Sequence, residues 1–168
     1  IPGSESFNGS YINRCYQKKL KMSHNNLKLM NLAASHFDDV MKLGNSVHGD
    51  GYLDQDACQQ ILNKSIKDEL NCSFVIYDNN KLVGFRLTYA PTRWDIDQWC
   101  SPELWGVPAE QTCYFKCNTV DENYRGQKVG RRLLEASIDV TKKMGATAGV
   151  CHTWMQSPGN LAYHYFIG

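Results

Sequence analysis

The sequence has no excess of charge of either sign. Lysine and arginine together number 18 and aspartate and glutamate 17, so the formal net charge is +1 at pH 7. That balance gives no general electrostatic reason to bind nucleic acid or an anionic membrane. No apolar run approaches the ~20 residues needed to cross a bilayer, and residues 1–21 lack the apolar core of a signal peptide. We therefore expect a soluble, cytoplasmic protein with a small-molecule partner and no nucleic-acid or membrane partner.

The sequence also lacks the cysteine spacing of a metal site or a disulfide framework. The seven cysteines include no Cys-x-x-Cys pair, and no His-rich cluster accompanies them. Cys113 and Cys117 look paired, but on a strand they lie roughly 13 Å apart, too far for a disulfide. We expect buried thiols and no metal. A catalytic thiol such as Cys100 or Cys151 is the alternative.

No repeat or low-complexity stretch divides the chain, and 168 residues suit one domain with a sizeable core. The first half predicts a strand at Leu27 to Met30, then two helices. The first helix buries Phe37, Val40, Met41 and Gly44; the second, capped by Asp54 or Asp56, carries the stripe Ala57, Ile61, Leu62, Ile66 and Leu70. Two strands then flank the turn sequence Asp78-Asn79-Asn80-Lys81, which predicts a hairpin.

The second half continues this α+β order. Cys113 to Val120 predicts a fourth strand, and a helix follows whose apolar face carries Val129, Leu133, Ala136, Val140 and Met144. Gly145 suits the position just past that helix. Ala148 to Met155 predicts a fifth strand, and Ser157-Pro158 opens a last helix.

The stretch from Val120 to Leu134 is the most informative in the chain. It runs from a strand end through a basic, glycine-containing turn into a helix. The first N–H groups of a helix have no partners within the helix and carry the positive end of its dipole, so a turn there can bind a pyrophosphate. The cations around this turn are Arg125, Lys128, Arg131 and Arg132.

Arg125 to Gly130 resembles the acyl-CoA binding loop of the GNAT superfamily of N-acyltransferases, in which Arg/Gln-x-x-Gly-x-Gly/Ala cradles the coenzyme A pyrophosphate. The resemblance covers roughly Leu27 to the C-terminus in the expected order of elements. It implies a mixed, mostly antiparallel central sheet flanked by helices, with acetyl-CoA as acyl donor. Lys128 departs from the pattern, because the family has its first motif glycine there. If the position needs positive φ, lysine costs on the order of 1 kcal/mol.

The resemblance also implies the cofactor contacts. The backbone of Asn118, Thr119 and Val120 is expected to meet the pantetheine and the acetyl carbonyl. The pyrophosphate is expected to contact the loop and helix start, which comprise Arg125, Gly126, Gln127, Lys128, Val129, Gly130, Arg131 and Arg132. Asn160 matches a family asparagine that contacts the pantetheine arm, with ordinary helix capping as the alternative.

In many members of the family, a tyrosine on the final helix reprotonates the departing thiolate. The alignment places Phe166 at that position, so the adjacent Tyr165 is our candidate for the acid, and simple packing is the alternative.

An insert at residues 90–108 suggests the acceptor site. Its candidate residues are Trp94, Asp95, Asp97, Trp99 and Trp105. Aromatic faces with a few acids suit an ammonium-bearing substrate through cation–π contacts and ion pairs. A small satellite core or a dimer contact is the alternative, since tryptophan is also enriched at interfaces.

Direct attack by an amine requires a base, because an alkyl amine with a reference pKa of ~10.4 is mostly protonated at neutral pH. No carboxylate lies between Cys113 and Val120, which leaves His152 and the acids of the insert, Asp95, Asp97 and Glu103. We favour His152, whose reference pKa of ~6.5 lets it accept a proton without tuning. A buried core histidine is the alternative.

Both ends depart from the family pattern. Met22 looks like a start, so residues 1–21 are expected to be an N-terminal extension or vector-derived, and residues 22–168 the GNAT-like domain. The family's last two strands are apparently lacking after Gly168. Four competing explanations remain for these lacking strands: an incomplete chain, unseen residues, a truncated gene, or replacement by another segment or subunit. An uncovered sheet edge favours a homodimer.

Together these features predict an acetyl-CoA-dependent N-acetyltransferase that acts on a primary amine of a small molecule by direct attack. Three alternatives remain: a peptide or protein amine as acceptor, a degenerate coenzyme A-binding module without turnover, and a structural or interaction protein.

Overall fold

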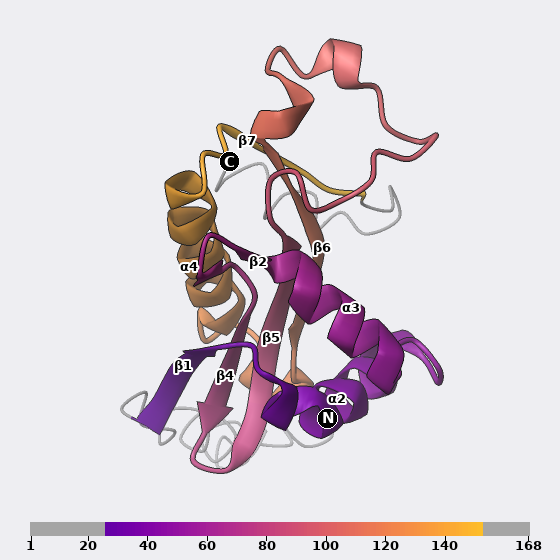
Figure 1. Ribbon diagram of the computed structural model, residues 1–168. Coiled ribbons are helices and arrows are strands. Elements are labelled where there is room, and N and C mark those ends of the chain that lie inside the picture. Colours follow the sequence, from indigo (N-terminus) through magenta and orange to yellow (C-terminus); the bar gives the residue numbers. More distant parts are fainter. Residues whose placement is uncertain (1–25, 153–168) are drawn as a thin grey trace, which may run out of the picture.

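The computed structural model describes residues 26–152, which form an α+β domain (Figure 1). Short 3-10 turns connect several of its elements. The helices and strands are β1 Leu27–Asn31, α2 Phe37–His48, α3 Gln55–Ser65, β2 Ile66–Lys67, β3 Leu70–Asn71, β4 Phe74–Asp78, β5 Lys81–Tyr89, β6 Thr112–Val120, α4 Val129–Lys143 and β7 Ala148–Val150.

The central sheet has five strands in the order β1-β4-β5-β6-β7. Every neighbouring pair is antiparallel except β6 and β7, which run parallel. The mixed, mostly antiparallel sheet that the sequence predicted is therefore confirmed. The hairpin between β4 and β5 turns at Asp78 and Lys81, with Asn79 at a φ of 52°.

Helices cover both faces of this sheet. One core lies under α2 and α3, where Phe37, Val40 and Ile61 pack toward Phe85 of β5. The other lies under α4, where Val129 and Leu133 pack on β4 and β5. Gly84 of β5 lets the first turn of α4 approach closely, since a Cβ there would lie 2.9 Å from Val129 Cγ1. The start of α4 is thus fixed against the centre of the sheet.

Strand β6 has two features that shape its free edge. Its pairing with β5 shifts between Leu87 and Thr88, and the shift leaves Lys116 as the extra residue of a β-bulge. On its other side β7 pairs only with Thr112 to Tyr114. From Phe115 onward, no strand within residues 26–152 pairs with that edge of β6. The sheet therefore opens between β6 and β7 toward the start of α4.

The second helix is shorter than its apolar stripe predicted. Helix α3 ends at Ser65, and Ile66 and Leu70, which the stripe had placed on the helix, lie in the small β2–β3 hairpin. Asp68 and Glu69 form its turn at φ values of 50° and 65°. The buried Ser65 hydroxyl donates to Ile61 O and bonds Ser73 Oγ, tying the helix end to the chain before β4. This tertiary contact ends the helix at Ser65, although apolar residues continue beyond it at the helical spacing.

Candidate functional site

The loop before α4 is held by contacts made at its first residues. The Asp121 carboxylate accepts hydrogen bonds from Asn123 N (2.9 Å) and pairs with Lys81 Nζ at 2.8 Å. The ion pair and the hydrogen bonds from Asn123 outweigh burial and lower the pKa of Asp121. The buried Tyr124 donates its hydroxyl to Asp78 at 2.7 Å. These contacts fix the chain between the end of β6 and the turn that leads into α4.

The turn itself reaches α4 through two residues with positive φ. Gly126 has a φ of 77°, and Lys128, the N-cap residue of α4, has a φ of 64° and a ψ of 11°. Lys128 thus occupies the left-handed conformation for which the family's glycine is suited, and its side chain makes no capping bond. The helix start therefore leaves its first backbone N–H groups uncapped by Lys128, as an anion site requires.

Replacing Lys128 with glycine is expected to stabilise the protein by roughly 0.5–1 kcal/mol. Relief of the left-handed conformation raises the free energy of unfolding by about 1–2 kcal/mol. The greater freedom of glycine in the unfolded chain lowers it by about 0.4–1 kcal/mol. Urea unfolding of the wild type, Lys128→Gly and the control Lys128→Ala measures this. The alanine variant removes the same side chain and keeps the strain, so an equal gain in both variants would contradict the strain argument.

On the α4 side of β6, Asn118 lies beside the first turn of the helix. Its amide donates weakly to Gly130 O at 3.5 Å. Its side-chain oxygen is buried and, among the described residues, accepts no hydrogen bond. A buried acceptor without a donor is costly, so the position suits a ligand that brings an N–H group, such as the amides of a pantetheine arm.

The opposite face of β6 carries a polar cluster that the sequence did not single out. His48, the last residue of α2, places Nε2 at 2.8 Å from Thr119 Oγ1 and 3.7 Å from Cys117 Sγ. The ring of Tyr52 packs on His48 with centroids 4.4 Å apart. Although His48 is exposed as a residue, partial burial of its ring lowers its pKa, so the imidazole is neutral at pH 7. No local signal links residues 71 apart in sequence.

The thiol of Cys117 belongs to the same cluster and is not suited to nucleophilic chemistry. Its hydrogen-bond partners are Thr119 Oγ1 at 2.9 Å and, through its hydroxyl, Tyr52. Burial raises the pKa of Cys117, and burial likewise raises the pKa values of Cys100 and Cys151. All three thiols therefore remain protonated at neutral pH, which argues against a catalytic thiolate.

The predicted acceptor residues of the insert divide into two groups. Trp94 stacks on Tyr114 of β6 with centroids 5.1 Å apart, tilts against Trp105 at 6.0 Å, and donates from Nε1 to Thr112 O. The rings of Trp105, Trp94 and Tyr114 thus form an aromatic wall. Asp97 lies near its Tyr114 end, where it faces His152. Asp95 instead pairs with Lys64 at 3.5 Å, and the side chain of Trp99 is exposed. The structure thus gathers Trp94, Trp105 and Asp97, and leaves Asp95 and Trp99 outside the cluster.

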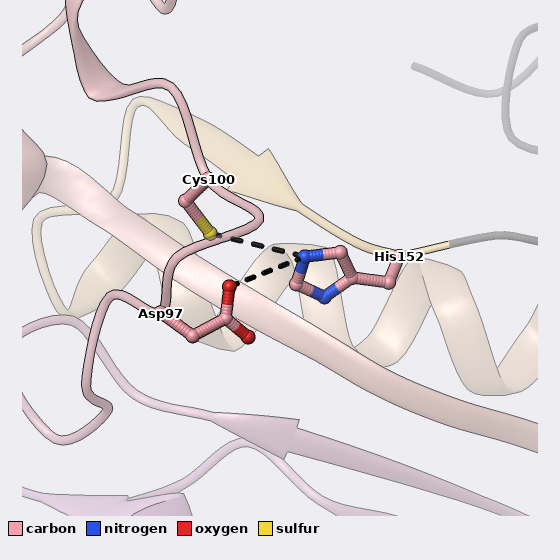
Figure 2. A group of neighbouring side chains, drawn as sticks. All are labelled: Asp97, Cys100 and His152. Atoms are coloured by element: carbon pink, nitrogen blue, oxygen red, sulfur yellow. Dashed lines mark hydrogen bonds and ion pairs between the residues drawn. The ribbon is translucent and has the colours of Figure 1, made fainter.

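His152 lies just past the last residue of β7 and joins β7 to the insert (Figure 2). Its Nδ1 is 2.9 Å from the Tyr114 hydroxyl, and its Nε2 is 3.6 Å from Asp97 Oδ1 and 3.9 Å from Cys100 Sγ. The side chain is 39% exposed, so the alternative of a buried core histidine is wrong. Tyr165 and Asn160 lie outside the described residues.

His152 and His48 lie toward opposite ends of the same face of β6. His152 contacts Tyr114 and His48 contacts Thr119. Because these two β6 positions pair with Tyr89 and Phe85, four residues apart on β5, they are separated by roughly 13 Å at ~3.3 Å per residue. Because the bulge at Lys116 shifts the alternation, Tyr114, Cys117 and Thr119 share this face. The face therefore presents a row of polar groups with an imidazole at each end.

The acetyltransferase (GNAT) family model matches residues 37–166, so the chain belongs to this family. It is an acetyl-CoA-dependent N-acetyltransferase, and acetyl-CoA is the acyl donor. No curated protein matches the chain in a sequence search. No helix in the described part, residues 26–152, is long and apolar enough to cross a membrane.

Solved structures similar to this chain have the same fold. The aminoglycoside N-acetyltransferase AAC(6′)-Iy in complex with CoA is 16% identical, with 84% of this chain and 86% of that chain covered and a TM-score of 0.64. Ard1 from Thermoplasma volcanium is 12% identical, with coverage of 85% and 82% and a TM-score of 0.65. The aminoglycoside acetyltransferase meta-AAC0020 from an uncultured soil metagenomic sample, in complex with sisomicin, is 22% identical, with coverage of 84% and 86% and a TM-score of 0.59.

Proposed function

We propose that the protein transfers acetyl from acetyl-CoA to a primary amine of a small molecule by direct attack on the thioester. The observation that carries this proposal is the open edge of β6 beside the uncapped start of α4, with an aromatic and acidic wall at the far end of the same strand. The cofactor enters from one side of this opening and the amine approaches from the other.

The cofactor is held by the residues predicted from the family motif. The pyrophosphate meets the backbone N–H groups from Gln127 to Arg131, whereas the N–H of Arg132 donates to Lys128 O at 3.0 Å. Arg125 and Lys128 add positive charge at the exposed rim. The pantetheine follows β6 from Asn118 to Val120 along the edge away from β5, where no strand within residues 26–152 pairs, and its amide donates to the Asn118 oxygen. Arg131 is turned toward Glu135 by an ion pair at 2.7 Å, so its contribution is smaller.

The acceptor amine is placed against Trp94, Trp105 and Asp97. An ammonium group is attracted by the faces of the stacked rings and by the carboxylate. His152 then takes the proton that the amine must lose before it attacks. The Tyr114 hydroxyl at Nδ1 fixes the ring, and Nε2 faces the insert. Tyr165 is the proposed acid for the departing thiolate.

His48 is a second candidate for the base. It is neutral at pH 7, and its Nε2 already bonds Thr119, which follows Asn118 on the expected path of the pantetheine. A proton taken there requires the acetyl group to lie at the Thr119 end of β6, whereas His152 requires it at the Tyr114 end. The two histidines therefore make opposite predictions for single alanine variants.

A small-molecule acceptor is favoured over a peptide by the wall itself. Trp94, Tyr114 and Trp105 form a compact aromatic surface, and the names of two similar structures give aminoglycosides as acceptors. The likeness to Ard1 supports a protein amine as the alternative acceptor.

We place the protein in the cytoplasm and propose a homodimer across the β7 edge. Light scattering tests the homodimer, and a monomer at all micromolar concentrations would contradict it.

The proposal is tested by release of free coenzyme A thiol from acetyl-CoA in the presence of aminoglycosides, simple alkyl diamines and short peptides. We expect turnover with one or more small amines and little with peptides. Turnover confined to peptides would select the protein-acetylating alternative. Calorimetric binding of acetyl-CoA without turnover on any amine would select the degenerate module.

A further inference from the structure

Three potential metal ligands from separate parts of the chain converge beside the aromatic wall. Asp97 and Cys100 come from the insert, and His152 comes from the chain after β7. One ligand atom from each of the three lies within 4.8 Å of the others. Figure 2 shows the Cys100 sulfur and an Asp97 oxygen both directed at the same ring nitrogen of His152.

This geometry differs from that of a Cys-His-Asp catalytic group. In such a group the acid holds one ring nitrogen and the nucleophile faces the other. Here Asp97 Oδ1 at 3.6 Å and Cys100 Sγ at 3.9 Å both face Nε2, and the Tyr114 hydroxyl holds Nδ1. A single N–H at Nε2 cannot donate well-aligned hydrogen bonds to both the Asp97 oxygen and the Cys100 sulfur. A cation between these two atoms and Nε2 can contact all three.

We propose that Asp97, Cys100 and His152 form a binding site for a thiophilic divalent cation of the Zn²⁺ type. Thiolate, imidazole and carboxylate are the donors that Zn²⁺ takes in proteins. With Zn–S of about 2.3 Å and Zn–N of about 2.0–2.1 Å, tetrahedral ligands stand roughly 3.4–3.6 Å apart. The observed separations from Nε2 are a few tenths of an ångström longer, and the Asp97 and Cys100 ligand atoms lie within 4.8 Å of each other, so an inward movement on the order of 1 Å completes the site.

The surroundings of His152 support its role as a ligand. When Nδ1 donates its proton to the Tyr114 oxygen at 2.9 Å, Nε2 presents a lone pair toward Asp97 and Cys100. Asp97 and Cys100 are also linked locally, because Cys100 N donates to Asp97 O at 3.1 Å. When the cation binds, a metal–sulfur bond replaces the S–H bond of Cys100, and the proton leaves to solvent.

Three protein ligands leave a fourth position of a tetrahedral ion open to water or another ligand. The site lies at the surface, with Asp97 and His152 exposed and Cys100 partly buried, so the ion can exchange with solvent. A bound ion occupies the Nε2 lone pair that the proposed acetyl transfer requires. We therefore expect Zn²⁺ bound at this site to inhibit the enzyme, a consequence that rests on the proposed function.

The test is Co²⁺ titration of the reduced, metal-free full chain, followed by competition with Zn²⁺ against a chromophoric chelator. We expect one Co²⁺ per chain, with a near-ultraviolet thiolate-to-metal absorption band that Zn²⁺ abolishes. Cys100→Ser should remove the band. His152→Ala and Asp97→Asn should weaken Zn²⁺ binding at least tenfold, and Tyr114→Phe about tenfold, as expected for a group that orients a ligand.

Matched variants separate this site from other thiols and acids. Cys151→Ser, next to His152, and Asp95→Asn, two residues before Asp97, should keep the band and the affinity. Far-ultraviolet circular dichroism checks that each variant is folded. Lack of Co²⁺ and Zn²⁺ binding at micromolar protein, or a band that survives Cys100→Ser, would overturn the proposal. Because binding is measured without turnover, its outcome is independent of the acetyl-transfer assay.

Discussion

A Gly130→Glu variant is expected to lose the thermal stabilisation that acetyl-CoA gives the wild type. A ligand bound only by the native state adds about 2.7 kcal/mol at a hundredfold excess over Kd, which raises the melting temperature by roughly 5–10 °C for a domain of this size. Gly130 lies in the first turn of α4, where we propose that the pyrophosphate approaches the backbone. A glutamate there adds bulk and negative charge at that position.

The control for this experiment is Lys143→Glu, at the last residue of the same helix. It also adds negative charge but lies about 20 Å from the helix start, given a rise of 1.5 Å per residue. We expect the full acetyl-CoA shift in this variant. A full shift in Gly130→Glu would place the cofactor elsewhere, and no shift in the wild type at millimolar acetyl-CoA would remove the basis of the proposed site.

The second large effect is expected for His152→Ala, with kcat lowered roughly 10²-fold or more and the affinity for acetyl-CoA nearly unchanged. General base catalysis contributes about 10²–10⁴-fold, and His152 contacts Tyr114 and Asp97 of the proposed acceptor site rather than the proposed phosphate loop. Steady-state kinetics in chelator-treated buffer, with acetyl-CoA binding measured in parallel, separates the two parameters.

His48→Ala is the matched comparison, since it removes the other imidazole beside β6. If His152 is the base, His48→Ala keeps kcat within a few-fold of the wild type. A large loss in His48→Ala together with an active His152→Ala enzyme would move the base to the Thr119 end of the strand. In that case activity should be retained down to a pH below 6.5, because partial burial lowers the pKa of His48.

Local sequence signals were sufficient for the elements that we propose hold the cofactor. The β6 strand, the basic turn and the stripe of α4 each depend on neighbours within a few residues, and the expected conformational demand on Lys128 is observed as its positive φ. The end of α3 was missed because a buried bond between Ser65 and Ser73, absent from any local pattern, stops the helix.

The groups of the proposed acceptor site were only partly predictable, because long-range packing brings them together. His48 meets Thr119 across 71 residues, and Cys100 meets His152 across 52. The need for a base and the positions of the ionisable residues along the chain named His152 and Asp97 as candidates but could not show that both face one another beside Tyr114. It also could not separate Asp95, which turns to Lys64, from Asp97.

The thiol-release assay with acetyl-CoA and a panel of amines tests the central claim most directly. Catalysed release of coenzyme A thiol that depends on a small primary amine, matched by an acetylated product of that amine in mass spectrometry, is the predicted result. Binding of acetyl-CoA with no amine-dependent thiol release from any small amine would contradict it.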